Sequence, residues 1–149
     1  DATAGAKRVA ALYAGCGTLT FPLSASSRVH AVEGAAALAD ALSSASRRAG
    51  YAGRVSGETR DLNRRPLHAD ELATFDAIVF DPPREGAAAQ TAEIARSKMK
   101  TVVGVSCNPA TFARDARILI DAGFRLERVT PIDQFLWSPH LELVGVFRR

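Results

Sequence analysis

The sequence predicts an α/β fold whose sheet is mostly parallel and covered by helices on both faces. Short β-rich runs alternate with longer alanine-rich stretches along the whole chain. The run 75–80, FDAIVF, is largely apolar and ends at Asp81-Pro82-Pro83, which is typical of a strand buried on both faces. Repeated strand–helix units of this length imply right-handed crossovers and parallel strands.

Seven runs have the length and composition of strands. The last two have no helix between them, so we expect the final strand to insert antiparallel. In chain order, the expected strands are Arg8–Tyr13, Arg28–Glu33, Arg54–Glu58, Phe75–Phe80, Thr101–Ser106, Phe124–Thr130 and Leu141–Phe147.

Glycine, asparagine and proline mark the expected helix ends. Gly50 and Gly123 stand where helices commonly stop, and Asn108-Pro109 gives an N-cap followed by proline at the first helical position. The expected helices are Thr18–Ala25, Ala35–Ala49, a short one near Asp70–Ala73, Ala87–Ser97 and Pro109–Ala122.

Length and composition favour one domain over residues 1–149, with 47% hydrophobic and 23% charged residues. There is no apolar run of about 18 residues, and the N-terminus lacks the pattern of a signal peptide. We therefore expect a cytoplasmic monomer without a membrane span. The first strand begins so early that we expect a fragment of a longer protein.

The cysteines, the histidines and the net charge give only weak indications of function. The two cysteines, Cys16 and Cys107, lie far apart and form no close-spaced ligand pair with the three histidines, so we expect no metal. A net charge of +3 leans slightly towards a polyanionic partner.

A glycine turn after the first strand predicts a cofactor site. Tyr13-Ala14-Gly15-Cys16-Gly17-Thr18 joins a strand to a helix, where glycines let backbone N–H groups approach a ligand. The third glycine of a dinucleotide fingerprint would fall at Thr20 and is absent, which weakens a hydride-transfer interpretation.

Two carboxylates extend this site along the same sheet edge. Glu33 ends the second strand, where it could accept both ribose hydroxyls of an adenosine. Asp61 follows the third strand and could receive the adenine amino group, although loop aspartates are common.

Two further loops carry residues suited to chemistry, Asp81-Pro82-Pro83-Arg84 and Ser106-Cys107-Asn108-Pro109. Both end strands, so we expect them to share the crevice where ligands bind in open α/β folds. A D-P-P loop would suit amino methylation, but such sites usually carry an aromatic residue where this chain has Arg84.

Cys107 is the candidate nucleophile because it precedes a helix start, whose N–H groups favour a thiolate. A thiolate adding to C6 of uracil would make C5 nucleophilic enough to take a methyl group from a sulfonium. Glu142 is the candidate base for the C5 proton, and His140 is an alternative. The two alternate along the last expected strand and would share a face.

Seven segments together resemble the methyltransferase domain of the RNA uracil-5 methyltransferase family, which modifies 23S ribosomal RNA and transfer RNA. They are LYAGCGTLTFPL, VHAVEG, TRDL, FDAIVFDPPREGA, VSCNPATFARD, LERVTPIDQF and SPHLELVGVFRR. The resemblance implies the Rossmann-like fold of class I S-adenosylmethionine-dependent methyltransferases, with RNA as partner. It favours 23S ribosomal RNA as the substrate.

The resemblance also implies residue roles. Cys107 would be the nucleophile, Glu142 the base, and Arg84 a support for the catalytic loop or a phosphate. The S-adenosylmethionine site would comprise Tyr13, Gly15, Gly17, Thr18, Glu33, Asp61 and Asp81.

The chain departs from the family at Ala11, usually aspartate, and at Ala14, often cysteine. The resemblance further implies an N-terminal RNA-binding barrel and an upstream segment that contributes to the cofactor pocket, which we expect to lie outside this fragment. We therefore expect the fragment to fold but to bind cofactor weakly and methylate poorly.

Two alternatives remain at this point. One is a cytosine-5 or exocyclic-amine methyltransferase of nucleic acid, although cytosine-5 enzymes typically carry a second cysteine where this chain has Pro82-Pro83. The other is a non-catalytic domain that binds RNA, against which stands the presence of both Cys107 and Glu142.

Overall fold

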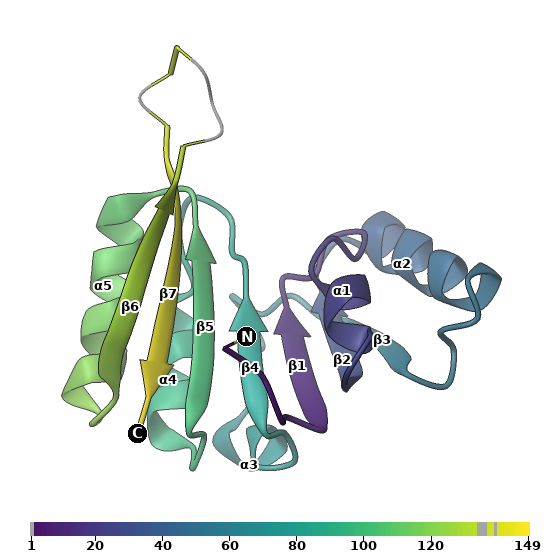
Figure 1. The fold of residues 1–149 in the computed structure, drawn as a ribbon, viewed down its shortest axis with the longest axis horizontal. Helices are drawn as coiled ribbons and strands as arrows, with labels where there is room; N and C mark the ends of the chain where they lie inside the picture. The colour runs from purple at the N-terminus through teal and green to yellow at the C-terminus, as the bar shows by residue number, and fades with distance from the viewer. Residues whose placement is uncertain (1, 134–136, 139) are drawn as a thin grey trace.

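A single seven-stranded sheet organises the chain, with strand order β3-β2-β1-β4-β5-β7-β6 (Figure 1). The computed structural model describes residues 2–133, 137–138 and 140–149. The strands are β1 (Arg8–Leu12), β2 (Arg28–Glu33), β3 (Val55–Thr59), β4 (Ala77–Phe80), β5 (Thr101–Ser106), β6 (Arg125–Ile132) and β7 (Glu142–Arg148).

Strand direction follows the sequence prediction. The first five strands are parallel, and β7 inserts antiparallel between β5 and β6. The carboxyl ends of β1 to β5 therefore meet at one edge of the sheet, called here the carboxyl edge. The opposite edge, where these strands begin, is the amino edge.

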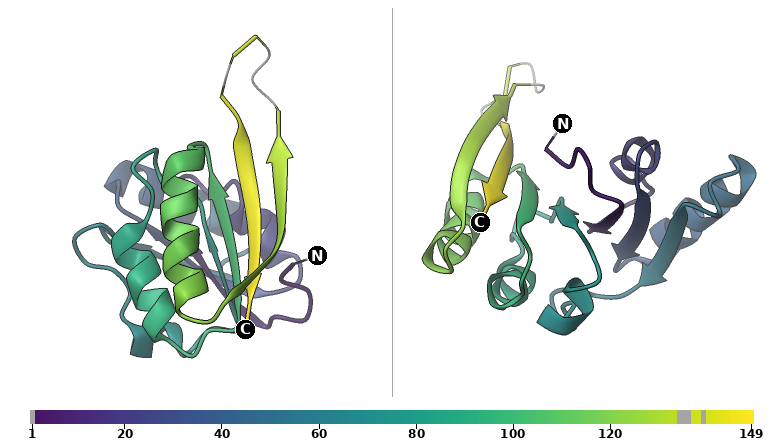
Figure 2. Two further views of the ribbon diagram at one scale, coloured as in Figure 1. Left: turned by 90° about the vertical axis from the view of Figure 1, so that its left-hand side faces the viewer. Right: turned by 60° about the horizontal axis from the view of Figure 1, so that its bottom comes forward.

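Five helices cover the two faces of the sheet (Figure 2). Helices α1 and α2 pack against β2 and β3 from one face, while α3, α4 and α5 lie along the other, as right-handed crossovers require. Their bounds are α1 (Thr20–Ser24), α2 (Ala36–Arg48), α3 (Ala69–Leu72), α4 (Ala88–Arg96) and α5 (Pro109–Asp121).

The core is split by the sheet, as the alternation of side chains in a strand dictates. Ala10 and Leu12 of β1 belong to the large cluster beneath α3, α4 and α5, whereas Val9 packs with Leu19 and Leu23 around α1. All four residues of β4 are buried, which confirms the prediction of a strand covered on both faces.

Most element ends lie within two residues of the prediction. Helix α1 begins at Thr20 rather than Thr18, with Leu19 as its N-cap residue. The predicted cap of α5 is confirmed, because the Asn108 side chain accepts the Ala110 N–H at 3.0 Å and Pro109 takes the first helical position. Among the described residues, none of the helices is long and apolar enough to cross a membrane.

Candidate active site

The turn after β1 has the backbone conformation that its glycines permit. Gly15 and Gly17 both have positive φ, and a Cβ at Gly17 would lie 2.5 Å from the Phe21 ring. Tyr13 also has positive φ, at 56°, which is uncommon for a residue with a side chain and marks local strain. Strained backbone of this kind is concentrated at functional sites.

Glu33 holds this turn against the end of β2. One carboxylate oxygen accepts the Gly15 N–H at 2.8 Å, and the other accepts the Ala35 N–H, also at 2.8 Å, at the start of α2. Each carboxylate oxygen can accept more than one hydrogen bond, so Glu33 can also receive hydroxyl groups.

A small hollow opens directly beneath the turn and brings four predicted residues together. Its lining includes Tyr13, Gly15, Thr18 and Asp81, while Ala11 contributes where the related family usually has aspartate. Backbone N–H groups, a strand-end carboxylate and a small apolar hollow fit an adenosine-containing cofactor such as S-adenosylmethionine.

Asp61 lies beside the turn rather than in the hollow. Its Cα is 3.5 Å from where a Gly34 Cβ would stand, and its carboxylate accepts the Asn63 N–H at 3.0 Å. Asn63 in turn accepts the Tyr13 hydroxyl at 3.1 Å. Burial, with repulsion from Asp115 and Asp61, raises the pKa of Tyr13, which keeps this phenol a hydrogen-bond donor.

Cys107 and Glu142 lie at adjoining ends of the neighbouring strands β5 and β7. The antiparallel pairing of these strands ends with Ser106 opposite Leu143. Cys107 follows Ser106 directly, in a bend, and Glu142 directly precedes Leu143 as the first residue of β7. The turn around Cys107 is fixed by Asn108, whose N–H donates to Ser106 Oγ at 3.1 Å.

Asp81 belongs to the same group of acids. Burial raises the pKa of Asp81, and repulsion from the Glu142 carboxylate adds to this. The end of β4 and the start of β7 thus lie within electrostatic range of each other, with β5 between the two strands.

One other predicted residue, His140, differs from expectation. His140 precedes β7, which begins at Glu142, so the expectation that the two alternate on a strand is wrong. The loop between β6 and β7 ends later than the apolar pattern suggests. The Arg84 side chain is exposed, and it is its backbone carbonyl that makes the contacts in the described part of the chain.

Sequence reasoning missed a set of residues on α5 that fasten the loop after β4. Asn108 Nδ2 donates to the Arg84 carbonyl at 3.1 Å, and Thr111 Oγ1 lies 3.1 Å from the same oxygen. The nucleophile loop and the Asp81 loop are therefore held together through the first turn of α5.

Residues in the second turn of α5 also hold the loop after β4 in place. The buried Asp115 carboxylate accepts the Ala87 N–H at 2.7 Å, and Arg114 Nη2 donates to the Glu85 carbonyl at 2.9 Å. A Cβ at Gly86, where φ is +77°, would lie 2.4 Å from Arg114 and 2.7 Å from Asp115. Thr111, Arg114 and Asp115 are spaced so that all three lie on one face of a helix. This spacing is the feature of the sequence that could have indicated a shared contact.

No group of three or more histidine, cysteine, aspartate or glutamate side chains suited to a metal ion occurs among the described residues. Cys16 and Cys107 are both free thiols, Cys16 exposed and Cys107 partly buried.

The fold and this edge define a Rossmann-like methyltransferase domain. Over 96% of the chain, it superimposes on an S-adenosylmethionine-dependent methyltransferase from Aquifex aeolicus with a TM-score of 0.71, at 16% identity and covering 82% of that chain. Over 95% of the chain, it matches 34% of the Pyrococcus abyssi tRNA (uracil-54, C5)-methyltransferase, solved with S-adenosyl-L-homocysteine, with a TM-score of 0.81 and 25% identity.

Sequence comparison identifies the family. A family model described as tRNA (uracil-5-)-methyltransferase matches residues 54–149, more than half of the chain, and the chain belongs to this family. It is 59% identical to an uncharacterized RNA methyltransferase from Caulobacter vibrioides, over 97% of this chain and 35% of that protein. It is 39% identical to the 23S rRNA (uracil(1939)-C(5))-methyltransferase RlmD of Pseudomonas putida, over 95% of this chain and 31% of that protein. The chain thus spans about a third of the length of these relatives.

Proposed function

We propose that this chain is the catalytic domain of an enzyme that methylates C5 of a uridine in RNA, with S-adenosylmethionine as methyl donor. The observation that carries the proposal is that Cys107 and Glu142 directly adjoin the last residue pair of β5 and β7, at the edge that also holds the Asp81 loop. Membership of the uracil-5 methyltransferase family supports it. We favour 23S ribosomal RNA as the substrate because the Pseudomonas putida relative, named for that reaction, is more similar than the Pyrococcus abyssi tRNA enzyme.

Cys107 opens the reaction by adding its thiolate sulfur to C6 of the uracil. The C5–C6 π electrons move towards O4, giving an enolate whose C5 is nucleophilic. When bound, S-adenosylmethionine supplies a methyl group to C5 from its sulfonium. The ring then carries both the new methyl group and a hydrogen at C5.

Glu142 completes the reaction by taking that C5 proton. The electrons of the C5–H bond restore the C5–C6 double bond, and the C6–S bond breaks to return the Cys107 thiolate. The proton on Glu142 passes to solvent. A nucleophile and a base at adjoining ends of neighbouring strands suit this chemistry, because addition and proton removal occur at adjacent carbons of the ring.

The residues near the turn serve binding. Glu33 would receive the ribose hydroxyls and Asp61 the adenine amino group, while Gly15 and Gly17 allow close approach of the backbone. Tyr13, Thr18 and Asp81 would line the remainder of the site.

The test is to trap the covalent intermediate in the full-length protein. RNA containing 5-fluorouridine should form a stable adduct with Cys107 in the presence of S-adenosylmethionine, since fluorine cannot leave as a proton does. Cys107→Ser should form none. Cys16→Ser, which removes the chain's other free thiol, is the matched control and should still form the adduct.

Each contrary outcome has a distinct meaning. Absence of an adduct with the unaltered protein, or an undiminished adduct with Cys107→Ser, would overturn the mechanism. An adduct with 5-fluorocytidine but not with 5-fluorouridine would replace uracil by cytosine as the substrate base.

A further inference from the structure

Two basic hollows occupy the amino edge of the sheet, far from the site described above. Both are lined by Arg8, Arg28 and Arg54, and Lys7 lines the larger one. Their volumes are about 270 and 810 Å³. These four cationic residues are called here the amino-edge surface.

No acidic residue lines either hollow. Three carboxylates lie nearby. Glu58 and Glu71 both pair with Arg60, at 2.6 and 2.9 Å. Asp76 accepts only the backbone N–H groups of Lys7 and Arg8, at 2.8 and 2.9 Å, so it keeps its negative charge. Asp76 therefore offsets part of the positive charge of this surface, and an excess of cationic residues remains.

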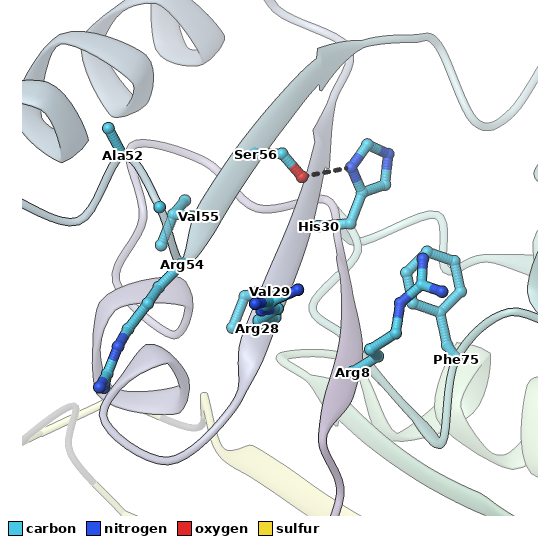
Figure 3. A pocket seen from close by; sticks show the side chains of 10 residues that line it. Arg8, Arg28, Val29, His30, Ala52, Arg54, Val55, Ser56 and Phe75 are labelled. Atoms are coloured by element: carbon cyan, nitrogen blue, oxygen red, sulfur yellow. Dashed lines mark hydrogen bonds between the residues drawn. The ribbon is translucent and has the colours of Figure 1, made fainter.

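Two of the four cations are pre-arranged (Figure 3). The Arg8 guanidinium lies over the Phe75 ring, 5.5 Å from its centroid, which orients the group while leaving its N–H donors available. The Arg54 side chain points away from Arg8. Its Nη1 donates to the carbonyls of Ser24 and Ala25 at the C-terminal end of α1.

The other two cations are unengaged within the described chain. The side chains of Lys7 and Arg28 make neither a hydrogen bond nor an ion pair with residues 2–133, 137–138 or 140–149. Arg28 stands between Arg8 and Arg54 at the start of β2 (Figure 3). A row of arginine forks over open hollows is suited to phosphodiester groups, which such forks bind in bidentate fashion.

The carboxyl edge has a mixed charge. Its carboxylates, Glu33, Asp61, Asp81 and Glu142, would repel an RNA backbone, while Arg64 and Arg84 lie in the same loops. Strand β1, five residues long, separates the two edges by about 15 Å at ~3.3 Å per residue. That exceeds the screening length of about 8 Å at physiological salt, so charges at one edge act weakly on groups at the other.

We propose that the amino-edge surface binds backbone phosphates of the RNA substrate, at a distance from the uridine that is methylated. This inference rests on the proposed function for the identity of the nucleic acid. Contacts to phosphate groups carry no information about base sequence. We therefore expect this surface to bind RNA through charge and without sequence specificity.

The test compares two double variants of the full-length protein that lose the same charge. Lys7→Gln with Arg28→Gln removes the two unengaged cations. Arg117→Gln with Arg125→Gln removes two exposed arginines of α5 and β6, and serves as control. Binding of a fluorescein-labelled RNA hairpin is measured by anisotropy from about 50 to 200 mM salt.

The amino-edge pair should weaken binding several-fold at the lowest salt and make the plot of log affinity against log salt shallower by about 1 to 2 units. The control pair should leave the slope near that of the unaltered protein. An unchanged slope for the amino-edge pair, or an equal loss in both pairs, would overturn the proposal. So would unchanged RNA binding with a lowered melting temperature, since another part of the protein would then cover this surface.

The 5-fluorouridine adduct separates this inference from the proposed function. At saturating RNA, the amino-edge pair should form the adduct as the unaltered protein does. Normal adduct formation with an unchanged salt slope would refute the phosphate surface alone. A shallower slope without an adduct in any variant would refute the uracil mechanism alone.

Discussion

The two edges of the sheet differ in the side chains that gather there and in backbone conformation. The carboxyl edge gathers Glu33, Asp61, Asp81 and Glu142 around a turn with three residues at positive φ. The amino edge gathers Lys7 and arginines around the C-terminal ends of helices. Both edges result from the same connectivity, in which each parallel strand is followed by a helix.

Helix direction explains this difference. In a parallel α/β sheet, helix N-termini point to the carboxyl edge and C-termini to the amino edge, and the helix dipole favours acids at the first and bases at the second. Glu33 accordingly accepts an N–H at the start of α2, while Arg54 donates to the carbonyls after α1. Arg149 donates to carbonyls at Ala95, Ser97 and Ala122, where α4 and α5 end. Substitutions at the two edges should therefore have different consequences.

Glu33→Gln should have the largest effect among binding residues. The amide nitrogen of the new glutamine would face one of the two N–H groups from which Glu33 now accepts a hydrogen bond. The turn would lose that hydrogen bond, and the ribose hydroxyls would lose an acceptor. We expect S-adenosylmethionine affinity to fall by about 10- to 100-fold, equivalent to roughly 1.4 to 2.7 kcal/mol, in isothermal titration of the full-length protein. Glu58→Gln, a carboxylate on β3 away from the turn, should leave the affinity unchanged. Equal losses in both would contradict the role of Glu33.

Asp115→Asn tests whether the α5 contacts hold the catalytic loops. The buried carboxylate would lose the charge that Arg114 and the Ala87 N–H now share. We expect a loss of about 1 to 3 kcal/mol in the free energy of unfolding, measured by urea denaturation. The rate of methyl transfer should also fall at temperatures where the variant remains folded. Asp121→Asn, an exposed partner of Arg117, is the control and should change both by little.

Arg54→Gln should separate stability from chemistry at the amino edge. Loss of its hydrogen bonds to the Ser24 and Ala25 carbonyls should lower the free energy of unfolding by about 1 kcal/mol. The methyl-transfer rate at saturating RNA and cofactor should be unchanged. A large fall in that rate would mean that the two edges are coupled.

Asp81→Asn should have the smallest effect on stability. Because the folded-state pKa of Asp81 is raised, the folded protein binds this proton more tightly than the unfolded chain. Stability without cofactor should therefore decline as pH rises from the ordinary carboxyl pKa through the raised one. The variant should lose this decline and be slightly more stable at neutral pH, by less than about 1 kcal/mol. Thermal melts from about pH 4 to pH 8 measure the difference. A steeper decline in the variant would contradict it.

Much of the fold followed from local pattern. The buried run at β4, the Asn108-Pro109 cap and the missing helix before β7 were each sufficient to predict their element. The start of α1 was predicted two residues early, because the sequence pattern placed the helix directly after Gly17 and did not indicate that Leu19 would be its N-cap residue.

The site was predictable in part. Strand ends at one edge indicated that Glu33, Asp81 and Cys107 would converge, since that follows from topology alone. The bond from Tyr13 to Asn63 and the fastening by Asp115 depend on loop conformations that periodicity does not encode. His140 was placed on a strand because alternation continues through it, although pairing begins only at Glu142.

The proposed roles of Cys107 as nucleophile and Glu142 as base are tested most directly by Glu142→Gln in the full-length protein, with ordinary uridine RNA and S-adenosylmethionine. If Glu142 removes the C5 proton, the variant should stop after methyl transfer. A covalent adduct that carries the new methyl group should then accumulate on the Cys107 peptide, as mass spectrometry would show. His140→Ala should turn over without accumulating it. Free methylated RNA produced at the normal rate by Glu142→Gln, or accumulation in His140→Ala instead, would contradict these roles.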